Sequence, residues 1–212
     1  MYTKLFYLAV TDKRRSPMHE QVAKRTVDTV IASAGIVLSA PVVVVATCVI
    51  AGLSRESPFF IQERVGRHEE PFRLLKLKTM FSATHRRGAY LTRMGHWLRM
   101  YSIDELPQLW NVLRGEMSLV GPRPLLTEYL PYYNTEQRLR HTVRPGITGW
   151  AQVQGRNRLR WEEKFAYDRW YVTHQSLLLD LRILWLTLGQ LLRPRHVRPE
   201  GLAEEEKFRG SV

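Results

Sequence analysis

The sequence predicts a mixed α/β chain, rich in helix and with short strands, that carries an N-terminal re-entrant membrane helix hairpin. Two observations predict it: 26 uncharged residues run from Thr29 to Ser54, and after them short apolar runs alternate with turn residues and helical repeats. A length of 212 residues suits one domain with a small appendage. The expected parts are an N-terminal segment (1–23), the hairpin (24–56), a compact domain (57–193) and a charged C-terminal tail (194–212).

Pro41 divides the uncharged run into 12 residues before it and 13 after it. Each half would form a helix of about 18–20 Å, too short to cross a hydrocarbon core of about 30 Å. A mid-helix proline favours a bend, so we expect a break at Ser39 and Pro41. Basic residues flank the run on both sides, which favours placing both of its ends on the same side of a membrane. A kinked span and the core helix of a soluble protein remain alternatives to the re-entrant hairpin.

The compact domain has recognisable local signals. Alternation and turn residues predict strands at 58–62 and 72–77 around a turn at 66–71. The apolar spacing of Leu106, Leu109, Trp110 and Leu113 predicts a helix from Asp104 to Gly115. The sequence further predicts a strand that ends in a rigid turn within 115–124 and helices at 161–174 and 177–192. The last helix is apolar enough to be either a core helix or a helix resting on a bilayer surface.

The chain is strongly basic, with 32 Lys and Arg against 20 Asp and Glu, a net charge of +12 and a pI near 10.2. This charge favours anionic partners, which are nucleic acid, phosphorylated small molecules or an acidic membrane. A hydrophobic content of 44% excludes a disordered chain. One cysteine excludes a disulfide scaffold and a cysteine-based zinc site, and the seven His show no spacing typical of a transition-metal site.

Positive charge is concentrated as arginine in the middle of the chain. Residues 79–160 contain twelve Arg, no Lys and five acidic residues, a local net charge of +7. The planar guanidinium fork binds phosphate or carboxylate in bidentate fashion, so this usage favours phosphate recognition. The alternative is a solvated face in an Arg-rich chain, since Arg outnumbers Lys 25 to 7 overall.

Asp104 and Glu105 form an adjacent acid pair at the expected helix start. One interpretation is capping, because Ser102 and Glu105 have capping-box spacing and Asp104 could itself be the N-cap. The other is catalytic. A helix N-terminus keeps a carboxylate ionised, so Asp104 could attack phosphorus while the second acid holds Mg²⁺.

Two further segments suggest anion contacts. Pro122 and Pro124 restrict the backbone on both sides of Arg123, which suits a preorganised clamp, although a plain proline-rich turn would have the same sequence. Between Arg144 and Arg156, three glycines allow close approach of the backbone.

Taken together and in this order, these motifs resemble the bacterial sugar transferase family, the monotopic polyprenyl-phosphate phosphoglycosyl transferases, in their minimal catalytic form. The resemblance covers roughly residues 20–192. The matching residues are Lys24-Arg25-x-x-Asp28, Pro58-x-x-x-x-Gln62-x-Arg64-x-Gly66, Phe72-x-x-x-Lys76, Leu98-Arg99, Asp104-Glu105-Leu106-Pro107-Gln108, Asn111-Val112-Leu113-x-Gly115-x-Met117-Ser118-Leu119-Val120-Gly121-Pro122-Arg123-Pro124 and Arg144-Pro145-Gly146-Ile147-Thr148-Gly149-Trp150-Ala151-Gln152. The chain departs from the family pattern at Lys78, at Gln154 and in reading Ser39-Ala40-Pro41 at the hairpin break.

The resemblance implies transfer of a sugar 1-phosphate from a nucleotide diphosphate sugar, usually UDP-linked, to undecaprenyl phosphate, with release of UMP, as the first membrane step of a glycan pathway. It implies that Asp104 forms a covalent phosphosugar intermediate, that Glu105 completes the dyad and that Mg²⁺ binds at these two acids. Residues 57–193 would be a catalytic domain on the cytoplasmic face of the bacterial inner membrane, and a homodimer is compatible. The implied substrate- and phosphate-binding residues are Lys76, Arg99, Arg123, Arg144, Gln152 and Arg156.

Two other functions remain open on the sequence. A membrane-bound glycosyltransferase would move the sugar without its phosphate and release the nucleoside diphosphate. A membrane-tethered nucleic-acid-binding protein would explain the charge and the interspersed aromatic residues, but no binding module is recognisable, so we expect no nucleic acid partner.

Overall fold

The computed structural model describes residues 18–54, 57–81, 90–91, 93–155 and 158–192, together with Phe208 and Gly210. Arg156, residues 1–17 of the expected N-terminal segment and nearly all of the expected tail (194–212) lie outside the described residues. Segments labelled η are short 3-10 helices. In chain order the elements are α2 (Met18–Ser54), β1 (Phe59–Val65), η1 (Arg67–Glu69), β2 (Pro71–Leu77), β3 (Met80–Phe81), β4 (Tyr90–Leu91), α3 (Arg93–Met100), η2 (Ile103–Glu105), α4 (Gln108–Arg114), β5 (Ser118–Val120), η3 (Thr127–Tyr132), α5 (Thr135–Arg138), η4 (Leu139–Thr142), β6 (Gly146–Thr148), α6 (Trp150–Gln154), α7 (Trp161–His174) and α8 (Leu177–Leu192).

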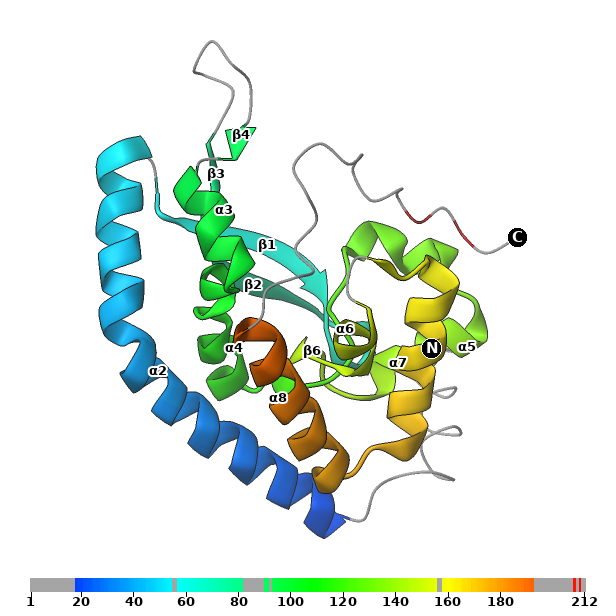
Figure 1. Ribbon diagram of the computed structural model, residues 1–212. Coiled ribbons are helices and arrows are strands. Elements are labelled where there is room, and N and C mark those ends of the chain that lie inside the picture. Colours follow the sequence, from blue (N-terminus) through cyan, green and yellow to red (C-terminus); the bar gives the residue numbers. More distant parts are fainter. Residues whose placement is uncertain are drawn as a thin grey trace.

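The chain is mixed, rich in helix and with short strands, as the sequence predicts. The uncharged run forms one continuous helix, α2, of 37 residues that passes through Pro41 and curves around the rest of the domain (Figure 1). The structure therefore does not contain two separate helices with a break at Ser39 and Pro41. A proline removes one backbone hydrogen bond but its fixed φ is compatible with a helix. Ser39 Oγ donates to Ile36 O at 3.4 Å within the helix, so this side chain bonds the helix backbone instead of starting a turn.

Both halves of α2 pack on the same domain. In the first half, Ala32 is fully buried in the main core, and a Cβ atom placed on Gly35 would lie 3.0 Å from Leu109 of α4. In the second half, Ala46 and Ile50 belong to a smaller core cluster with residues of β2 and α3. The small residues allow this close approach, so α2 is an integral part of the fold along most of its length.

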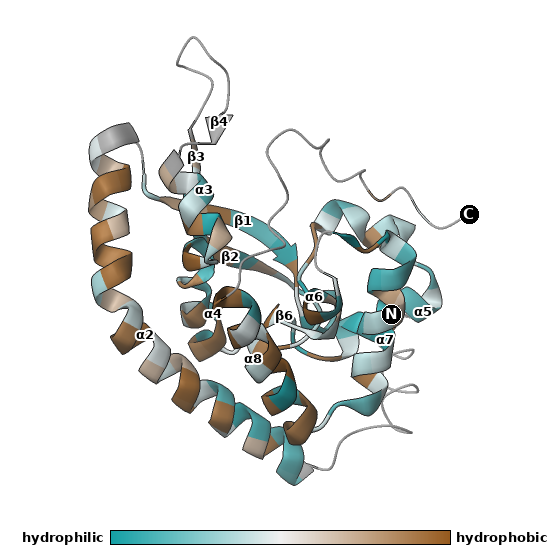
Figure 2. Ribbon diagram, in the orientation of Figure 1, coloured by the Kyte–Doolittle hydropathy of each residue, from teal (hydrophilic) through white to brown (hydrophobic). Residues whose placement is uncertain are grey.

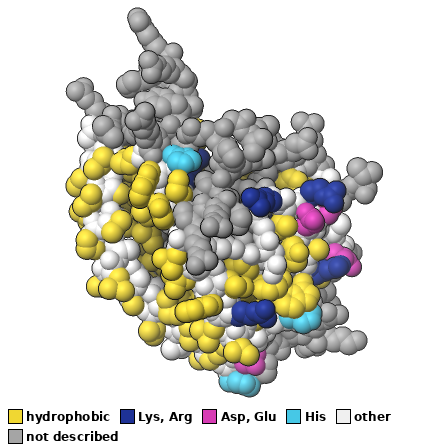
Figure 3. All heavy atoms as spheres, viewed as in Figure 1, with side chains coloured by type: hydrophobic (Ala, Val, Ile, Leu, Met, Phe, Trp, Pro, Cys, Tyr) yellow, Lys and Arg dark blue, Asp and Glu magenta, His cyan; other side chains and the backbone are white. Residues whose placement is uncertain are grey.

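The outward face of α2 is apolar and exposed. Among the described residues, the segment His19–Gly52 is long and apolar enough to cross a membrane by length and composition. The exposure of its large apolar side chains is greatest at Val37 (73%) and Leu38 (80%), close to Pro41. Figure 2 shows the hydrophobic colouring along α2 and α8, and Figure 3 shows apolar side chains gathered over these helices.

The strands are short and form three pairs. β1 and β2 are antiparallel, with Phe59 opposite Leu77 and Val65 opposite Pro71, which confirms the two strands and the turn expected between them. β5 and β6 are parallel, with Ser118 opposite Gly146. β3 pairs with β4. The main core lies between the β1–β2 and β5–β6 pairs and helices α2, α4, α7 and α8.

The two C-terminal helices form where the sequence predicts them. α7 covers Trp161–His174, and α8 covers Leu177–Leu192. Ile183 of α8 is fully buried in the core, whereas Leu178 and Trp185 are 79% and 75% exposed. α8 is therefore a core helix on one face and presents an apolar surface on the other.

The helix expected from Asp104 to Gly115 is divided in the structure. Asp104 lies in the 3-10 segment η2, and α4 begins only after Pro107. Ser102 adopts a left-handed conformation (φ 54°) and its side chain makes no cap hydrogen bond, so the capping interpretation of the acid pair is wrong. The helix ends as predicted, because Gly115 takes up φ 83° as its C-cap.

The close approach of the backbone at Gly146 and Gly121, where β6 pairs with β5, requires glycine. A Cβ atom on Gly146 would lie 2.7 Å from Gly121 Cα, and neither backbone can move without breaking the strand pair. We expect Gly146→Ala to lower the free energy of unfolding by about 3 kcal/mol, at the upper end of overpacking costs.

Gly189→Ala is the matched control, since nothing lies within 4 Å of the new Cβ in the interior of α8. This change should be neutral or should stabilise the helix by up to about 1 kcal/mol. Denaturant unfolding in detergent measures both variants. A Gly146→Ala protein that unfolds with wild-type stability would contradict the close approach of the backbone at Gly146 and Gly121.

Candidate active site

Three distant segments meet at the acid pair. Asp104 and Glu105 lie in η2, Lys76 lies on β2, and Arg123 lies in the turn after β5. Glu105 Oε1 accepts hydrogen bonds from Lys76 Nζ at 3.2 Å and from Arg123 Nη2 at 2.7 Å. The structure thus brings together four of the residues that the sequence analysis selected.

A buried ion pair fixes the backbone of the turn that carries Arg123. Arg140 donates from Nη2 to the Arg123 carbonyl oxygen at 2.7 Å and also to Asp168 Oδ2 at 2.8 Å. Arg140 and Asp168 are each 4% exposed in their side chains, so this ion pair is buried. Together with Pro122 and Pro124, it restricts the backbone of Arg123 and leaves the guanidinium to face Glu105.

The two acids have opposite electrostatic properties. Burial raises the pKa of Glu105, but the charges of Arg123 and Lys76 and their hydrogen bonds outweigh it and bring that pKa down from 4.5 to about 2. Burial and the negative charge of Glu105 raise the pKa of Asp104 from 3.8 to about 6, against the charges of Lys76, Arg99 and Arg123. Glu105 is therefore a permanent anion, whereas Asp104 changes charge near neutral pH.

Asp104 is buried, at 7% exposure, yet none of the hydrogen bonds between described residues involves its carboxylate. Burial of a carboxyl group without such a partner is energetically unfavourable. A carboxylate that lies beside three cations and has no hydrogen-bond partner in the described part of the chain is typical of a group that acts on a ligand rather than one that stabilises the fold.

Two arginines extend the positive charge around the acids. Arg99 Nε donates to Thr79 Oγ1 at 2.8 Å, and its charge lowers the pKa of Asp104. Arg64, which the sequence analysis quoted without a role, donates to Gln62 Oε1 at 2.6 Å. Burial and the charge of Arg123 lower the pKa of Arg64 to about 10. The strand predicted at 58–62 ends before Arg64, whereas β1 continues to Val65, and the period-two spacing of Gln62 and Arg64 then places both on one face.

The remaining selected residues lie elsewhere or outside the description. Arg144 Nε donates to Gly115 O at 2.8 Å, at the end of α4 that lies away from the acids. Gln152 lies on α6, and its two amide atoms are buried and have no hydrogen-bond partner among the described residues. Arg156 is not described. Binding of substrate by these three residues stays a prediction.

The acid pair is compatible with a magnesium ion that also contacts a ligand. No group of three or more His, Cys, Asp or Glu that could hold a metal ion occurs among the described residues, so the described part of the chain offers no metal cage built of protein ligands alone. Mg²⁺ commonly takes one or two carboxylates together with substrate phosphates, and Asp104 and Glu105 supply such oxygen atoms.

Comparison with known proteins assigns the family. Residues 19–194 match the family described as bacterial sugar transferase, which is most of the chain and includes the whole acid and arginine cluster. The chain belongs to the bacterial sugar transferases. This confirms the resemblance on which the functional expectations depend.

Relatives of this sugar transferase span several named activities. An uncharacterized sugar transferase of Bacillus subtilis, EpsL, is 47% identical over 80% of this chain and 88% of its own length. The UDP-glucose:undecaprenyl-phosphate glucose-1-phosphate transferase of Caulobacter vibrioides is 40% identical over 80% of this chain and 69% of its own length. The UDP-galactose-lipid carrier transferase of Erwinia amylovora is 37% identical over 80% of this chain, but the matching region is only 40% of that longer protein.

The electrostatic arrangement of this sugar transferase predicts a specific response to loss of Lys76. The Lys76 charge lowers the pKa of Asp104, so Lys76→Met should raise that pKa above about 6 while Arg123 keeps Glu105 ionised. Carboxyl ¹³C NMR titration of the metal-free protein measures both groups.

Lys164→Met on α7 is the control, because Lys164 is not among the charges acting on Asp104. An Asp104 pKa that stays at about 6 in Lys76→Met would contradict the assignment of Lys76 as a charge that acts on Asp104.

Proposed function

We propose that this protein transfers a sugar 1-phosphate from a UDP-sugar to undecaprenyl phosphate and releases UMP. The observation that carries the proposal is the buried carboxylate of Asp104, which has no hydrogen-bond partner among the described residues and lies beside an acid already neutralised by Lys76 and Arg123. Relatives named as undecaprenyl-phosphate sugar phosphotransferases support the choice of acceptor.

In the proposed reaction, a carboxylate oxygen of Asp104 attacks the β-phosphorus of the nucleotide sugar. The bond from this phosphorus to the oxygen that bridges the two phosphates breaks, and UMP leaves with the bonding electrons. The protein then holds the sugar phosphate as an acyl phosphate on Asp104. A phosphate oxygen of undecaprenyl phosphate attacks the same phosphorus, Asp104 leaves as a carboxylate, and the lipid diphosphate sugar is formed.

The surrounding cations favour this reaction for an electrostatic reason. Negative charge accumulates on the diphosphate as the bond breaks, and preorganised donors at that position lower the barrier. Arg123 is held by the Arg140 contact to its carbonyl and by Glu105, so its guanidinium needs little reordering. Glu105 fixes Lys76 and Arg123 beside Asp104, and Arg64 adds positive charge on the β1 side.

We further propose that Asp104 and Glu105 hold Mg²⁺ when the donor is bound. The ion would supply positive charge to offset the charge of the diphosphate. Glu105 is suited to this role because its pKa of about 2 keeps it anionic at physiological pH.

The proposed membrane topology is re-entrant, with the domain on the cytoplasmic face of the inner membrane. Both halves of α2 pack on one domain. If α2 crossed the membrane, parts of that domain would have to lie on both sides of the membrane. The curved helix instead presents Val37 and Leu38 as its most exposed apolar side chains. We propose that these residues penetrate deepest and that the exposed face of α8 rests on the bilayer surface.

The nucleotide that is released tests the reaction. Purified protein in nanodiscs with Mg²⁺, a panel of UDP-sugars and undecaprenyl phosphate should release UMP with the correct donor. Intact mass measured without the lipid should show an adduct of one sugar phosphate. Asp104→Asn should abolish the adduct and lower turnover by at least about a thousandfold, as expected for loss of a nucleophile.

Glu162→Gln, at an exposed position in the first turn of α7, is the matched control and should retain both adduct and turnover. Release of UDP would contradict phosphate transfer and support the glycosyltransferase alternative. Turnover retained by Asp104→Asn would remove Asp104 as the nucleophile.

The topology has its own test. Single cysteines introduced in residues 10–20 and 60–70 of a chain whose Cys48 is replaced should react with an impermeant reagent from the same membrane side. Labelling of the two regions from opposite sides would establish a span and overturn the re-entrant proposal.

A further inference from the structure

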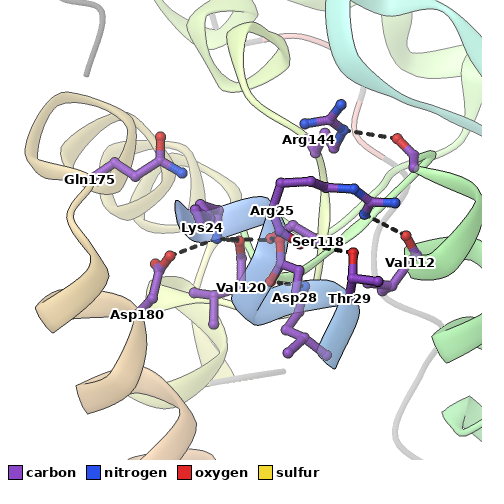
Figure 4. A network of polar contacts seen from close by, with 12 residues as sticks. Lys24, Arg25, Asp28, Thr29, Val112, Ser118, Val120, Arg144, Gln175 and Asp180 are labelled. Carbon is purple, nitrogen blue, oxygen red and sulfur yellow. Dashed lines mark hydrogen bonds and ion pairs between the residues drawn. The ribbon is translucent and has the colours of Figure 1, made fainter. Parts of the chain in front are cut away.

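The N-terminal part of α2 carries three charged side chains, Lys24, Arg25 and Asp28, that point into the domain (Figure 4). Arg25 donates from Nη1 to Val112 O at 2.6 Å and from Nη2 to Leu113 O at 2.9 Å. These carbonyls belong to the last turn of α4, where helical backbone acceptors run out, and Val112 O also accepts from the backbone N–H of Gly115 at 3.0 Å. Arg25 therefore caps the C-terminus of α4 with charge-assisted hydrogen bonds that also complement the helix dipole.

Asp28 contacts the next element, β5. Its Oδ2 accepts from Ser118 Oγ at 2.7 Å, and its Oδ1 accepts from the backbone N–H of Leu119 at 3.1 Å. The backbone N–H of Ser118 points to the other edge of the strand and donates to Pro145 O beside β6. The N–H of the next residue, Leu119, points the opposite way and donates to Asp28. The carboxylate, 4% exposed, thus replaces a neighbouring strand on the second edge of β5.

Lys24 completes the set at the end of β5. Its Nζ donates to Val120 O at 3.2 Å and to Asp180 Oδ2 of α8 at 2.6 Å. The hydroxyl of Tyr171 on α7 donates to Asp180 Oδ1 at 2.7 Å and lies 3.1 Å from the same Val120 oxygen. Lys24 of α2 and Tyr171 of α7 therefore both contact this carbonyl of β5, and Asp180 of α8 bonds both of those side chains.

The two elements that these side chains hold, α4 and β5, are each connected along the chain to one member of the Glu105–Arg123 pair. α4 begins three residues after Glu105, and β5 ends three residues before Arg123. A displacement of α4 relative to β5 would change the separation of Glu105 and Arg123, whose bond is 2.7 Å. Lys24 and Arg25 precede the uncharged run in the sequence, and both side chains form hydrogen bonds with groups of the domain.

We propose that Lys24, Arg25 and Asp28 are positioning residues that couple the seating of helix α2 to the geometry of the Glu105–Arg123 pair. The expected change in kcat rests on the function proposed above. The structural coupling between α2 and the Glu105–Arg123 pair can be measured whether or not that function is correct. Correct placement of α2 in the bilayer then favours the reactive arrangement, and a detached α2 loosens it.

Arg25 offers the sharpest test, since one side chain serves two adjacent carbonyls. Arg25→Gln should lower kcat about tenfold through misplacement of the reacting groups, with an unchanged KM for undecaprenyl phosphate and an unchanged membrane-bound fraction. Arg25→Lys keeps the charge but lacks the planar fork, so it should restore little of the loss. Thr26→Ala is the matched control, because that hydroxyl lies on the exposed face of α2 and, among the described residues, donates to Val22 O of the same helix.

Kinetic constants are compared at a temperature where thermal unfolding shows each variant to be fully folded, so lower stability alone cannot produce the change. Asp28→Ala and Asp28→Asn form a second pair. The alanine variant should resemble Arg25→Gln, and the asparagine variant should recover most activity because its amide can still bond both Ser118 and Leu119.

Hydrogen–deuterium exchange of residues 112–124 gives a readout that needs no substrate. Exchange should accelerate in Arg25→Gln and Asp28→Ala and stay at the wild-type rate in Thr26→Ala. Full activity of Arg25→Lys would show that only charge matters and would overturn the proposal, as would loss of Arg25→Gln from the membrane fraction. If the wild type released no UMP, the proposed function would fail, and unchanged exchange in Arg25→Gln would separately overturn the coupling.

Discussion

The neutralisation of one partly buried anion, Glu105, determines how the site is built. An ionised carboxylate at 15% exposure requires positive partners. Lys76 and Arg123 supply them from segments about 30 residues before and 20 residues after it. Meeting this requirement brings together β2, η2 and the turn after β5. The same cations surround Asp104, so the interaction that closes the fold also forms the reactive environment.

Other buried polar contacts hold the segments that carry Glu105 and Arg123 in place. The buried Arg140–Asp168 pair fixes the carbonyl of Arg123, and the charges at the start of α2 fix the end of α4 and the free edge of β5. Two of these contacts satisfy backbone groups at the ends or edges of short elements, namely the carbonyl of Leu113 at the end of α4 and the amide of Leu119 on the free edge of β5. Strands of three residues, such as β5 and β6, depend on this side-chain bonding because their ladders supply few hydrogen bonds.

Helix α2 shows how one element serves two environments. Its inward face uses small residues to approach α4 and charged residues to bond backbone, whereas its outward face is apolar and exposed. Pro41 does not divide this helix because proline is compatible with helical φ and costs one hydrogen bond. Curvature, rather than a break, lets both halves follow the domain while Val37 and Leu38 face outward.

The sequence by itself determined the features that depend on local pattern: the β1–β2 hairpin, α7 and α8, the glycine stop of α4, and the acid pair within an arginine-rich region. Only the tertiary structure decided which charges meet. Arg123 reaches Glu105 and Arg144 reaches Gly115, although both were equally plausible phosphate ligands in the sequence. Pro107 lies between the acids and the start of α4, and Ser102, in a left-handed conformation, precedes the acids, a division that periodicity could not reveal. Spacing along the chain encodes faces of helices and strands, but partners of charged groups are fixed by long-range packing, where burial makes each unpaired charge costly.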